Sequence, residues 1–207
     1  MSFHKEACVV SLSQAVNAEK SGAHRVEICA HLETDGMTPD IDLVEEIIRK
    51  INIPVRVMIR STEEGYGADK YTLQNMIDSI RQFKKIPADG FVIGIMKNNI
   101  IDKEAMMQII HHTVPKKITF HKAIDASHDL YRDIMWLNEQ HAIDTLLTSG
   151  GVGIAHEGIE KILMMKSFFK KTIMAGGKIT SYNLDALHKK TNLDWYHGRS
   201  IVGELGN

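Results

Sequence analysis

Two cysteines lie at similar positions in two short apolar segments near the N-terminus. Cys8 belongs to the segment Glu6–Val10, and Cys29 ends the segment Arg25–Cys29. Thiolate sulfur is a preferred ligand of soft ions such as Cu(I), and it also binds zinc. If the two segments form adjacent strands, both thiols would face the same side and could hold one metal ion. Packing in a core is the alternative, because free cysteine is among the most often buried residue types.

Ionisable side chains alternate with β-branched ones in segments of the same kind. In Val55–Arg60 the β-branched residues occupy every other position, and Arg56, Met58 and Arg60 fall between them. Successive side chains of a strand point to opposite faces, and a barrel packs its outer face against helices. We therefore expect the aliphatic residues to face helices and the ionisable ones to face the interior. The same reasoning over four segments gives an interior set of Glu6, Arg25, Glu27, Arg56, Arg60 and His121.

Charges gathered in one interior must be paired or hydrated, because an isolated buried ion costs several kcal/mol. For the residues deep in their strands, Glu6, Arg25 and Arg56, we favour a structural network of ion pairs. Arg60 and His121 stand at the ends of their strands. Active sites of (β/α) barrels lie at the C-terminal ends of the strands, so these two residues are candidates for function.

Such an interior would suit a small anionic substrate, either phosphorylated or sugar-like. Arg60 would bind the carboxylate or phosphate group of the substrate. Glu27 or His121 would act as the general acid or base. An enzyme of this kind is the alternative to a metal-binding protein, and the sequence leaves the choice open.

Two glycine-rich segments could bind an anion through their backbone. Thr172–Asn183 contains Gly176 and Gly177 before a helix-like stretch, and Leu147–Gly153 contains Ser149 among glycines. Glycine turns let N–H groups approach an anion, and phosphate in barrels often binds after strands seven and eight. We expect anion binding at Ser149, Gly176 and Gly177. The alternative is that these glycines only permit tight turns.

Eight short apolar runs alternate with longer amphipathic stretches along the chain. The runs are Glu6–Val10, Arg25–Cys29, Val55–Arg60, Phe91–Ile95, Ile118–His121, Thr145–Thr148, Thr172–Ala175 and Asp194–His197. Strands that alternate with helices form parallel sheets, and eight of them favour a closed (β/α)8 TIM barrel of the α/β class. The sequence after the last run has room for only part of a last helix. An open doubly wound sheet is the alternative fold.

Signals for helix ends lie between the strand runs. Thr38 followed by Pro39 predicts a capped helix start ahead of Ile41–Ile51, where apolar residues recur at helical spacing. Gly22 predicts the end of the first helix. Further N-caps are predicted at Thr72, Asp102, Ser127 and Ser181.

The composition limits the classes of function. The 207 residues carry 25 Lys and Arg against 26 Asp and Glu, which argues against a nucleic-acid-binding protein. There is no apolar run long enough for a membrane span, and MSFHKEACVV does not resemble a secretory signal. With two cysteines outside any C-x-x-C pair, we expect a reduced, cytoplasmic protein. No linker divides the chain, so we expect residues 1–207 to form a single TIM-barrel domain.

Six separated motifs together resemble the CutC copper homeostasis family. They are Arg25–Ala30, Gly36–Pro39, Ile53–Arg60, Thr119–Asp125, Leu147–Gly150 and Ile173–Gly177. The resemblance extends from Glu6 to His197 and follows the order of the motifs in the family. It implies a (β/α)8 barrel in the cytoplasm that forms a homodimer and takes part in copper tolerance or trafficking.

The resemblance also implies a ligand and a pocket. Copper, as Cu(I), would bind at Cys8 and Cys29. The family pocket would be surrounded by Glu6, Glu27, Arg60, His121, Asp125 and His197. In an enzyme, Asp125 would join the catalytic groups and His197 would help to bind the substrate anion.

Two departures from the family pattern affect these expectations. The family continues for several tens of residues beyond the position of His197, so we expect the flank of the eighth strand to be exposed or covered by a second subunit. An exposed flank could also recruit a partner, which would make the protein a scaffold. The stretch Ser61–Lys70 lacks the arginine- and glycine-rich run common in the family, so ligand contacts by this loop are not expected.

Overall fold

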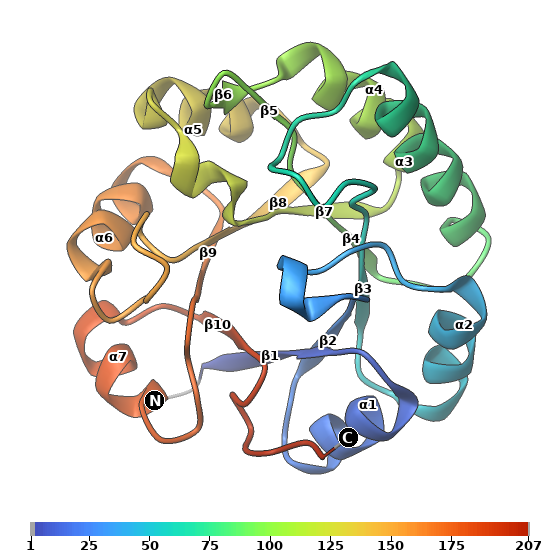
Figure 1. The fold of residues 1–207 in the computed structure, drawn as a ribbon. Helices are drawn as coiled ribbons and strands as arrows, with labels where there is room; N and C mark the ends of the chain where they lie inside the picture. Colours follow the sequence, from blue (N-terminus) through green and yellow to red (C-terminus); the bar gives the residue numbers. More distant parts are fainter. Residues whose placement is uncertain (1–2, 207) are drawn as a thin grey trace.

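Eight parallel strands close into a barrel at the centre of the computed structural model, which describes residues 3–206 (Figure 1). The strands are β1 (His4–Val9), β2 (Arg25–Ile28), β3 (Val55–Met58), β4 (Gly90–Ile93), β7 (Lys117–Phe120), β8 (Ile143–Thr148), β9 (Thr172–Gly176) and β10 (Trp195–Gly198). Each pairs with the next barrel strand, and β10 pairs with β1 to complete the ring. The predicted TIM barrel is therefore confirmed, with each strand within about two residues of its predicted bounds.

Helices surround the barrel in the order in which they follow the strands (Figure 1). They are α1 (Leu12–Lys20), α2 (Ile41–Lys50), α3 (Lys70–Phe83), α4 (Lys103–Thr113), α5 (Leu130–Glu139), α6 (Ile159–Phe168) and α7 (Leu184–Thr191). Shorter elements occupy the loops: η1 (Leu32–Thr34), η2 (Lys122–Ala126) and the hairpin of β5 (Met96–Lys97) and β6 (Ile100–Ile101). Within the described part of the chain, none of the helices combines the length and the apolar character needed to cross a bilayer.

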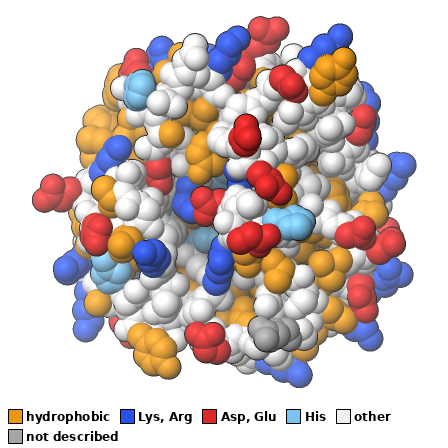
Figure 2. Space-filling view, viewed as in Figure 1, with side chains coloured by type: hydrophobic (Ala, Val, Ile, Leu, Met, Phe, Trp, Pro, Cys, Tyr) orange, Lys and Arg blue, Asp and Glu red, His pale blue; other side chains and the backbone are white. Residues whose placement is uncertain are grey.

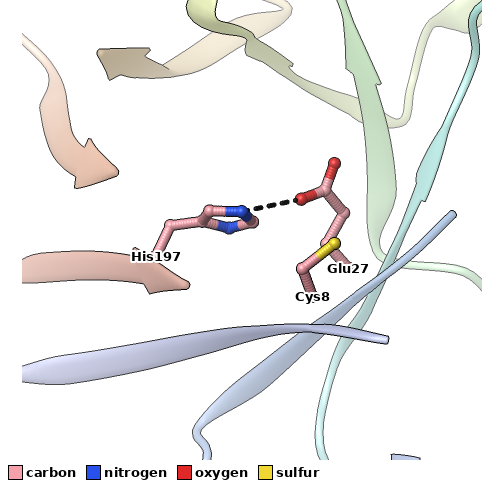
Figure 3. Close-up of side chains that lie close together, drawn as sticks. All are labelled: Cys8, Glu27 and His197. Atoms are coloured by element: carbon pink, nitrogen blue, oxygen red, sulfur yellow. Dashed lines mark ion pairs between the residues drawn. The ribbon is translucent and has the colours of Figure 1, made fainter. Parts of the chain in front are cut away.

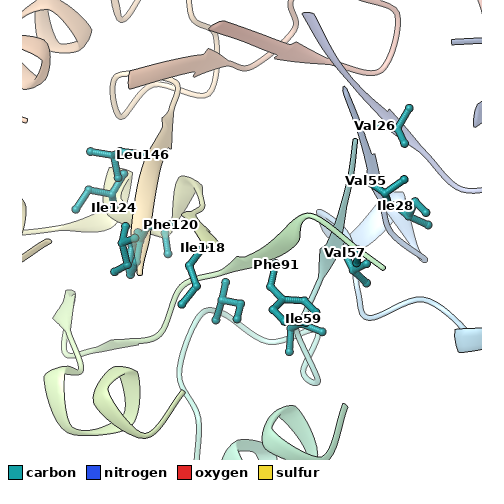
Figure 4. Packing of buried hydrophobic residues seen from close by; sticks show 14 of the residues in the cluster. Val26, Ile28, Val55, Val57, Ile59, Phe91, Ile118, Phe120, Ile124 and Leu146 are labelled. Carbon is teal, nitrogen blue, oxygen red and sulfur yellow. The ribbon is translucent and has the colours of Figure 1, made fainter. Parts of the chain in front are cut away.

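The main apolar core lies between the strands and the helices rather than inside the barrel. Val55, Val57 and Ile59 point outward into this layer, as the alternation of β3 predicts (Figure 4). Phe91 and Phe120 do the same from β4 and β7 (Figure 4). A second, smaller cluster inside the barrel contains Cys8, Cys29, Met58 and Val92, with Leu32 packed against it. The outer core thus leaves the interior of the barrel to the polar and sulfur-containing residues.

Of the five predicted helix caps, Asp102 is confirmed, whereas Thr38, Thr72, Ser127 and Ser181 are wrong. Asp102 caps α4 by accepting from Ala105 N at 3.0 Å, as predicted. The other caps are Asp40 for α2, Asp69 for α3, Asp129 for α5 and Asn183 for α7. Thr38, predicted as a cap, instead binds the backbone of Arg60, accepting from its N–H at 2.9 Å and donating to its carbonyl at 3.0 Å. Gly22, with φ of +85°, follows the end of α1 as predicted.

The segment after β10 returns across α1 (Figure 1). Gln14 and Asn17 of α1 donate side-chain hydrogen bonds to the carbonyls of Gly206 and Leu205, at 3.0 and 2.9 Å. Ile201 and Leu205 are buried in the main core. In the described part of the chain this segment occupies the position outside β10 and β1 where an eighth helix would pack, so the flank of β10 is partly covered.

Candidate functional site

A cavity opens at the C-terminal ends of the barrel strands. Figure 2 shows this hollow at the centre of the molecule, with basic, acidic and histidine side chains inside it. Its volume is about 540 Å³, including the part open to solvent. It is lined by Cys8, Glu27, Cys29, Leu32, Asp35, Met58, Arg60, Tyr66, His121, Lys122, Leu147, His197 and Arg199. The position is that of barrel binding sites.

The two cysteines lie side by side on one wall of the cavity. Their Sγ atoms are 2.9 Å apart, and the side chains are buried. They come together because β1 pairs with β2 and both residues face inward, as predicted. The Met58 side chain follows on β3, and the Met58 Cε and Cys29 Sγ atoms lie against the same glycine, Gly36. Two thiols and a thioether therefore share one apolar corner.

The adjacent thiols ionise at very different pH values. A hydrogen bond from Cys29 is the main cause that lowers the pKa of Cys8 to about 6, with a contribution from His197. The pKa of Cys29 is raised well above its usual value, because Cys29 holds the shared proton and is buried. Cys8 is therefore the thiolate of the pair near neutral pH.

His197 is held in place by a chain of buried charges behind it. Its Nδ1 lies 2.9 Å from Glu6 Oε1, and the other oxygen of Glu6 accepts from Arg25 Nε. Burial tends to raise the pKa of Glu6, but Arg25 and His197 outweigh it and lower the pKa to about 2. An ionised carboxylate only accepts, so Nδ1 carries a proton and donates to Glu6. Nε2 then faces the cavity.

Glu27 contacts the Nε2 atom of His197, which faces the cavity. Its Oε2 lies 3.3 Å from His197 Nε2 (Figure 3). Burial, followed by the negative charge of Cys8, raises the pKa of Glu27 to about 8. The pKa of His197 is raised well above its usual value; burial opposes this, but Glu27, Cys8 and Glu6 outweigh it. Oε1 of Glu27 is buried without a hydrogen-bond partner in residues 3–206.

Arg60 brings a positive charge without a carboxylate partner to the end of β3, the strand next to β2. It is 7% exposed, and no carboxylate of residues 3–206 lies within ion-pair distance of it. The guanidinium donates to backbone carbonyls of the two loops beside it, including Gly36 O at 3.3 Å and Gly65 O at 3.2 Å. Its Nε is buried and has no partner in the described chain. Lys122 and Arg199 also line the cavity; Lys122 lies 3.5 Å from Asp35, whereas Arg199 has no carboxylate partner in residues 3–206, so the cations outnumber the acidic groups at the rim.

His121 is fixed as a neutral imidazole. Ala123 N donates to its Nδ1 at 3.2 Å, which places the ring proton on Nε2. Burial, and then the charge of Arg60, lowers the pKa of His121 to about 3. Gly94 makes room for the ring, since a Cβ there would lie 2.6 Å from Nδ1. Near neutral pH this side chain can donate a hydrogen bond but is a weak base.

The structure separates the predicted site residues into two groups. Those that line the cavity are Cys8, Glu27, Cys29, Arg60, His121 and His197. Asp125 in η2, Ser149 after β8, and Gly176 and Gly177 at the end of β9 do not belong to that lining. Asp125 accepts from the Ser149 hydroxyl at 2.6 Å and also from the Thr148 hydroxyl, which ties η2 to the end of β8.

The glycine pair is needed for contact between two loops. A Cβ on Gly177 would lie 2.7 Å from Gly153 O, and Gly177 has φ of +113°. Ala155 N donates to Gly177 O at 3.1 Å, so the loops after β8 and β9 pack directly against each other. A Cβ on Gly176 would lie 2.7 Å from Leu147. Close packing therefore gives one reason for both glycines, and anion binding at them stays a prediction.

Several cavity residues were not predicted. Lys122 directly follows His121 and Arg199 comes two residues after His197, and closeness to a strand-end histidine was an available signal for both. Tyr66 lies in the loop that was not expected to contact a ligand, yet it lines the cavity, with its ring 5.2 Å from the ring of His121. No pattern in that loop predicts this contact.

The sequence profile of the CutC family matches residues 3–202, which is nearly the whole chain. The chain belongs to the CutC family. A human protein named as a copper homeostasis protein CutC homologue is 33% identical over 198 residues, which cover 94% of this chain and 72% of the human one. A homologue of the same name from Caenorhabditis elegans is 30% identical over an alignment that covers 96% of this chain and 81% of the nematode protein.

The fold agrees with that of a solved CutC structure. The structure from Streptococcus agalactiae superposes with a TM-score of 0.91 at 27% identity, over 96% of this chain and 99% of the other. CutC membership thus rests on both sequence and structure. It connects the chain with copper homeostasis.

Proposed function

We propose that this CutC protein binds Cu(I) through Cys8 and Cys29 as its part in copper homeostasis. The observation that supports this most directly is the 2.9 Å separation of two buried sulfur atoms at the mouth of the barrel. Cu(I) prefers soft ligands, and thiolates are among the softest that a protein offers. The ion would replace the proton that the two sulfurs share, and the sulfurs would move apart to hold it, since two metal–sulfur bonds of about 2.3 Å at a tetrahedral angle separate them by about 3.8 Å.

The surroundings of the thiols support the same proposal. Met58 supplies a thioether next to Cys29, and Val92 and Leu32 keep this corner apolar. An apolar shell limits the access of water and oxygen to a bound ion. The corner also opens to the cavity, which gives copper a route in and out.

An anaerobic titration with Cu(I) against a competing chelator would test the proposal. We expect one ion to bind per chain in the wild type, and we expect Cys8→Ser/Cys29→Ser to lose this binding. Met58→Leu keeps the volume of the side chain and removes its sulfur, so it should weaken binding without abolishing it. Equal affinity of the wild type and the double variant would reject the cysteine site.

A second candidate function is that of an enzyme acting on a small anionic substrate. The observation in its favour is Arg60, a buried cation with an unsatisfied Nε and no carboxylate partner in residues 3–206. An unpaired buried charge is costly, and an oxyanion from a ligand would satisfy it. The substrate would be phosphorylated or sugar-like. Lys122 and Arg199 at the rim would attract it.

The acid–base groups of such an enzyme follow from the site. Glu27 would act as the general acid, because a carboxyl group with a pKa of about 8 keeps its proton near neutral pH. His121 would donate a hydrogen bond from Nε2 rather than accept a proton. Asp125, Ser149, Gly176 and Gly177 would contribute by fixing the loops around the substrate, and His197 by orienting Glu27.

Calorimetric titration with inorganic phosphate and with glycerol phosphate would test this second candidate. We expect saturable binding that is lost in Arg60→Gln and weakened in Lys122→Gln. Arg49→Gln, at an exposed position on α2, is the control and should bind as the wild type does. Lys122→Gln leaves the loop contacts of Arg60 in place, so it remains informative if Arg60→Gln does not fold. Absence of saturable binding of both probes to the wild type would reject this candidate.

We also propose that the protein works as a homodimer in the cytoplasm. Two adjacent free thiols suit a reducing compartment, in which they stay available for a metal ion. Sedimentation of the purified protein would determine the oligomeric state.

A further inference from the structure

Three side chains of different chemistry converge at one point of the cavity wall. Cys8 comes from β1, Glu27 from β2 and His197 from β10, and Figure 3 shows all three directed at a common space. One sulfur, one oxygen and one nitrogen atom of these residues lie within 4.8 Å of one another. Zinc bonds of about 2.0–2.3 Å at tetrahedral angles separate neighbouring ligands by about 3.3–3.8 Å. The cluster therefore has the right scale for one ion after small movements.

The histidine is oriented as in known metal centres. His197 Nδ1 donates to Glu6 at 2.9 Å, and Glu6 is itself held by Arg25. A metal-binding histidine nearly always donates its second ring nitrogen to a carboxylate or carbonyl group in this way. This contact leaves Nε2 as the nitrogen that faces Cys8 and Glu27.

Glu27 adds an independent observation. The residue is 2% exposed, and its Oε1 is buried without a hydrogen-bond partner in residues 3–206. A buried carboxylate oxygen without a partner is rare in folded proteins, because its desolvation is not compensated. A cation beside Cys8 and His197 would supply the missing interaction.

The donor set also discriminates between metals. A bound ion would displace the proton of Glu27, and the resulting carboxylate and the Cys8 thiolate carry two negative charges, which a divalent ion neutralises and Cu(I) does not. Mixed sulfur, nitrogen and oxygen donors suit an ion of intermediate softness such as Zn²⁺. With three protein ligands and a cavity in front of them, the fourth position would be open, as in catalytic rather than structural zinc sites.

We propose that Cys8, Glu27 and His197 form a binding site for a divalent ion of the zinc class. Its fourth coordination position opens to the cavity near Arg60 and His121. The site shares Cys8 with the proposed Cu(I) site but does not use Cys29 or Met58. The divalent site can therefore be tested separately from copper binding, although the two ions would compete for the Cys8 thiolate.

Titration of the reduced, metal-free protein with Co²⁺ would test the site. Cobalt(II) occupies zinc sites and gives a thiolate-to-metal absorption band when a cysteine binds it. We expect this band at one ion per chain, with Zn²⁺ displacing the cobalt. Cys8→Ser should abolish the band, and Glu27→Gln and His197→Gln should weaken binding by more than about tenfold. Glu6→Gln should weaken it by about 10–100-fold, because Glu6 orients His197.

Cys29→Ser is the matched control, because its hydroxyl can still donate to the Cys8 sulfur. It should keep the cobalt band and lose Cu(I) binding, which separates the two proposals. A wild type without a stoichiometric thiolate band would overturn the divalent site. A band that survives Glu27→Gln and disappears in Cys29→Ser would also overturn it. If a Glu27 or His197 variant does not fold, the near-isosteric pair Cys8→Ser and Cys29→Ser decides.

Discussion

Buried charges in this barrel differ in whether they have partners. Arg25 and Glu6 satisfy each other, and Glu6 also accepts from His197. At the mouth, Arg60 lacks a carboxylate and Glu27 keeps one free oxygen, counting all of residues 3–206. Paired charges can be explained by the fold alone. Unpaired ones at the C-terminal ends of the strands are better explained by a ligand.

Arg56 lies near the N-terminal end of β3 and allows a test of whether paired buried charges stabilise the fold. It is 2% exposed, and it donates to Asp144 at 2.6 Å, to Asp89 at 3.3 Å and to the hydroxyl of Thr119. Arg56→Met should lower the free energy of unfolding by about 2–3 kcal/mol. This is below the value of about 3–5 kcal/mol for breaking a fully buried pair, because both aspartates stay partly hydrated. Urea unfolding would measure the loss.

Arg49→Met is the matched control for this measurement. Arg49 lies on the exposed face of α2, and its ion pair with Glu45 is open to water. An exposed pair contributes little, so this variant should stay within about 0.5 kcal/mol of the wild type. If both variants lose equal stability, the buried ion pairs of Arg56 stabilise the barrel no more than an exposed pair does.

At the scale of elements, the alternation of side chains along the strands predicted most of the residues that line the cavity. It placed Cys8, Glu27, Cys29, Arg60 and His121 in the interior, and the structure has all five around one cavity. The reason is physical: a barrel strand has only two faces, and the outer one must pack against helices. Identifying the aliphatic face therefore also identifies the interior face.

Loops could not be predicted in the same way, because their conformation depends on contacts between distant segments. Gly177, predicted to bind an anion, has φ of +113° and packs against Gly153, and no pattern in the sequence indicated that second contact. Thr38 was predicted to cap a helix, yet it binds the backbone of Arg60. Tyr66 reaches the cavity from a loop without a recognisable pattern. Each outcome depends on a partner that is remote in sequence.

At the scale of the whole molecule, the net charge conceals an uneven distribution. The chain as a whole carries a formal charge of −1, but three cationic side chains, Arg60, Lys122 and Arg199, surround the cavity mouth. A positive mouth on a nearly neutral protein attracts anions locally without promoting binding to nucleic acids. Next to Arg60 it also penalises a positive charge on His121, whereas His197, or a metal ion beside it, lies against the anionic groups of Cys8, Glu6 and Glu27.

The cost of protonating His121 makes the stability of the folded chain depend on pH. The groups that face His121 are Arg60, Lys122 and Asp35, together with the phenol of Tyr66. Its pKa is about 3 in the folded chain, against an ordinary value of 6.5, because of burial and then Arg60. Between these pH values the unfolded chain binds one more proton than the folded chain. The free energy of unfolding must therefore fall as the pH is lowered from 6.5 towards 3, by at most about 1.4 kcal/mol per pH unit from this residue.

Urea unfolding of the wild type and of His121→Asn at about pH 6.5 and about pH 4.5 would isolate this contribution. Asparagine can still accept from Ala123 N but does not titrate, so we expect the variant to lose less stability than the wild type on acidification. His141→Asn, at an exposed position, should follow the wild-type curve. If His121→Asn and the wild type lose equal stability between the two pH values, then His121 is protonated in the folded protein. Burial and the charge of Arg60 would in that case not keep a proton off His121.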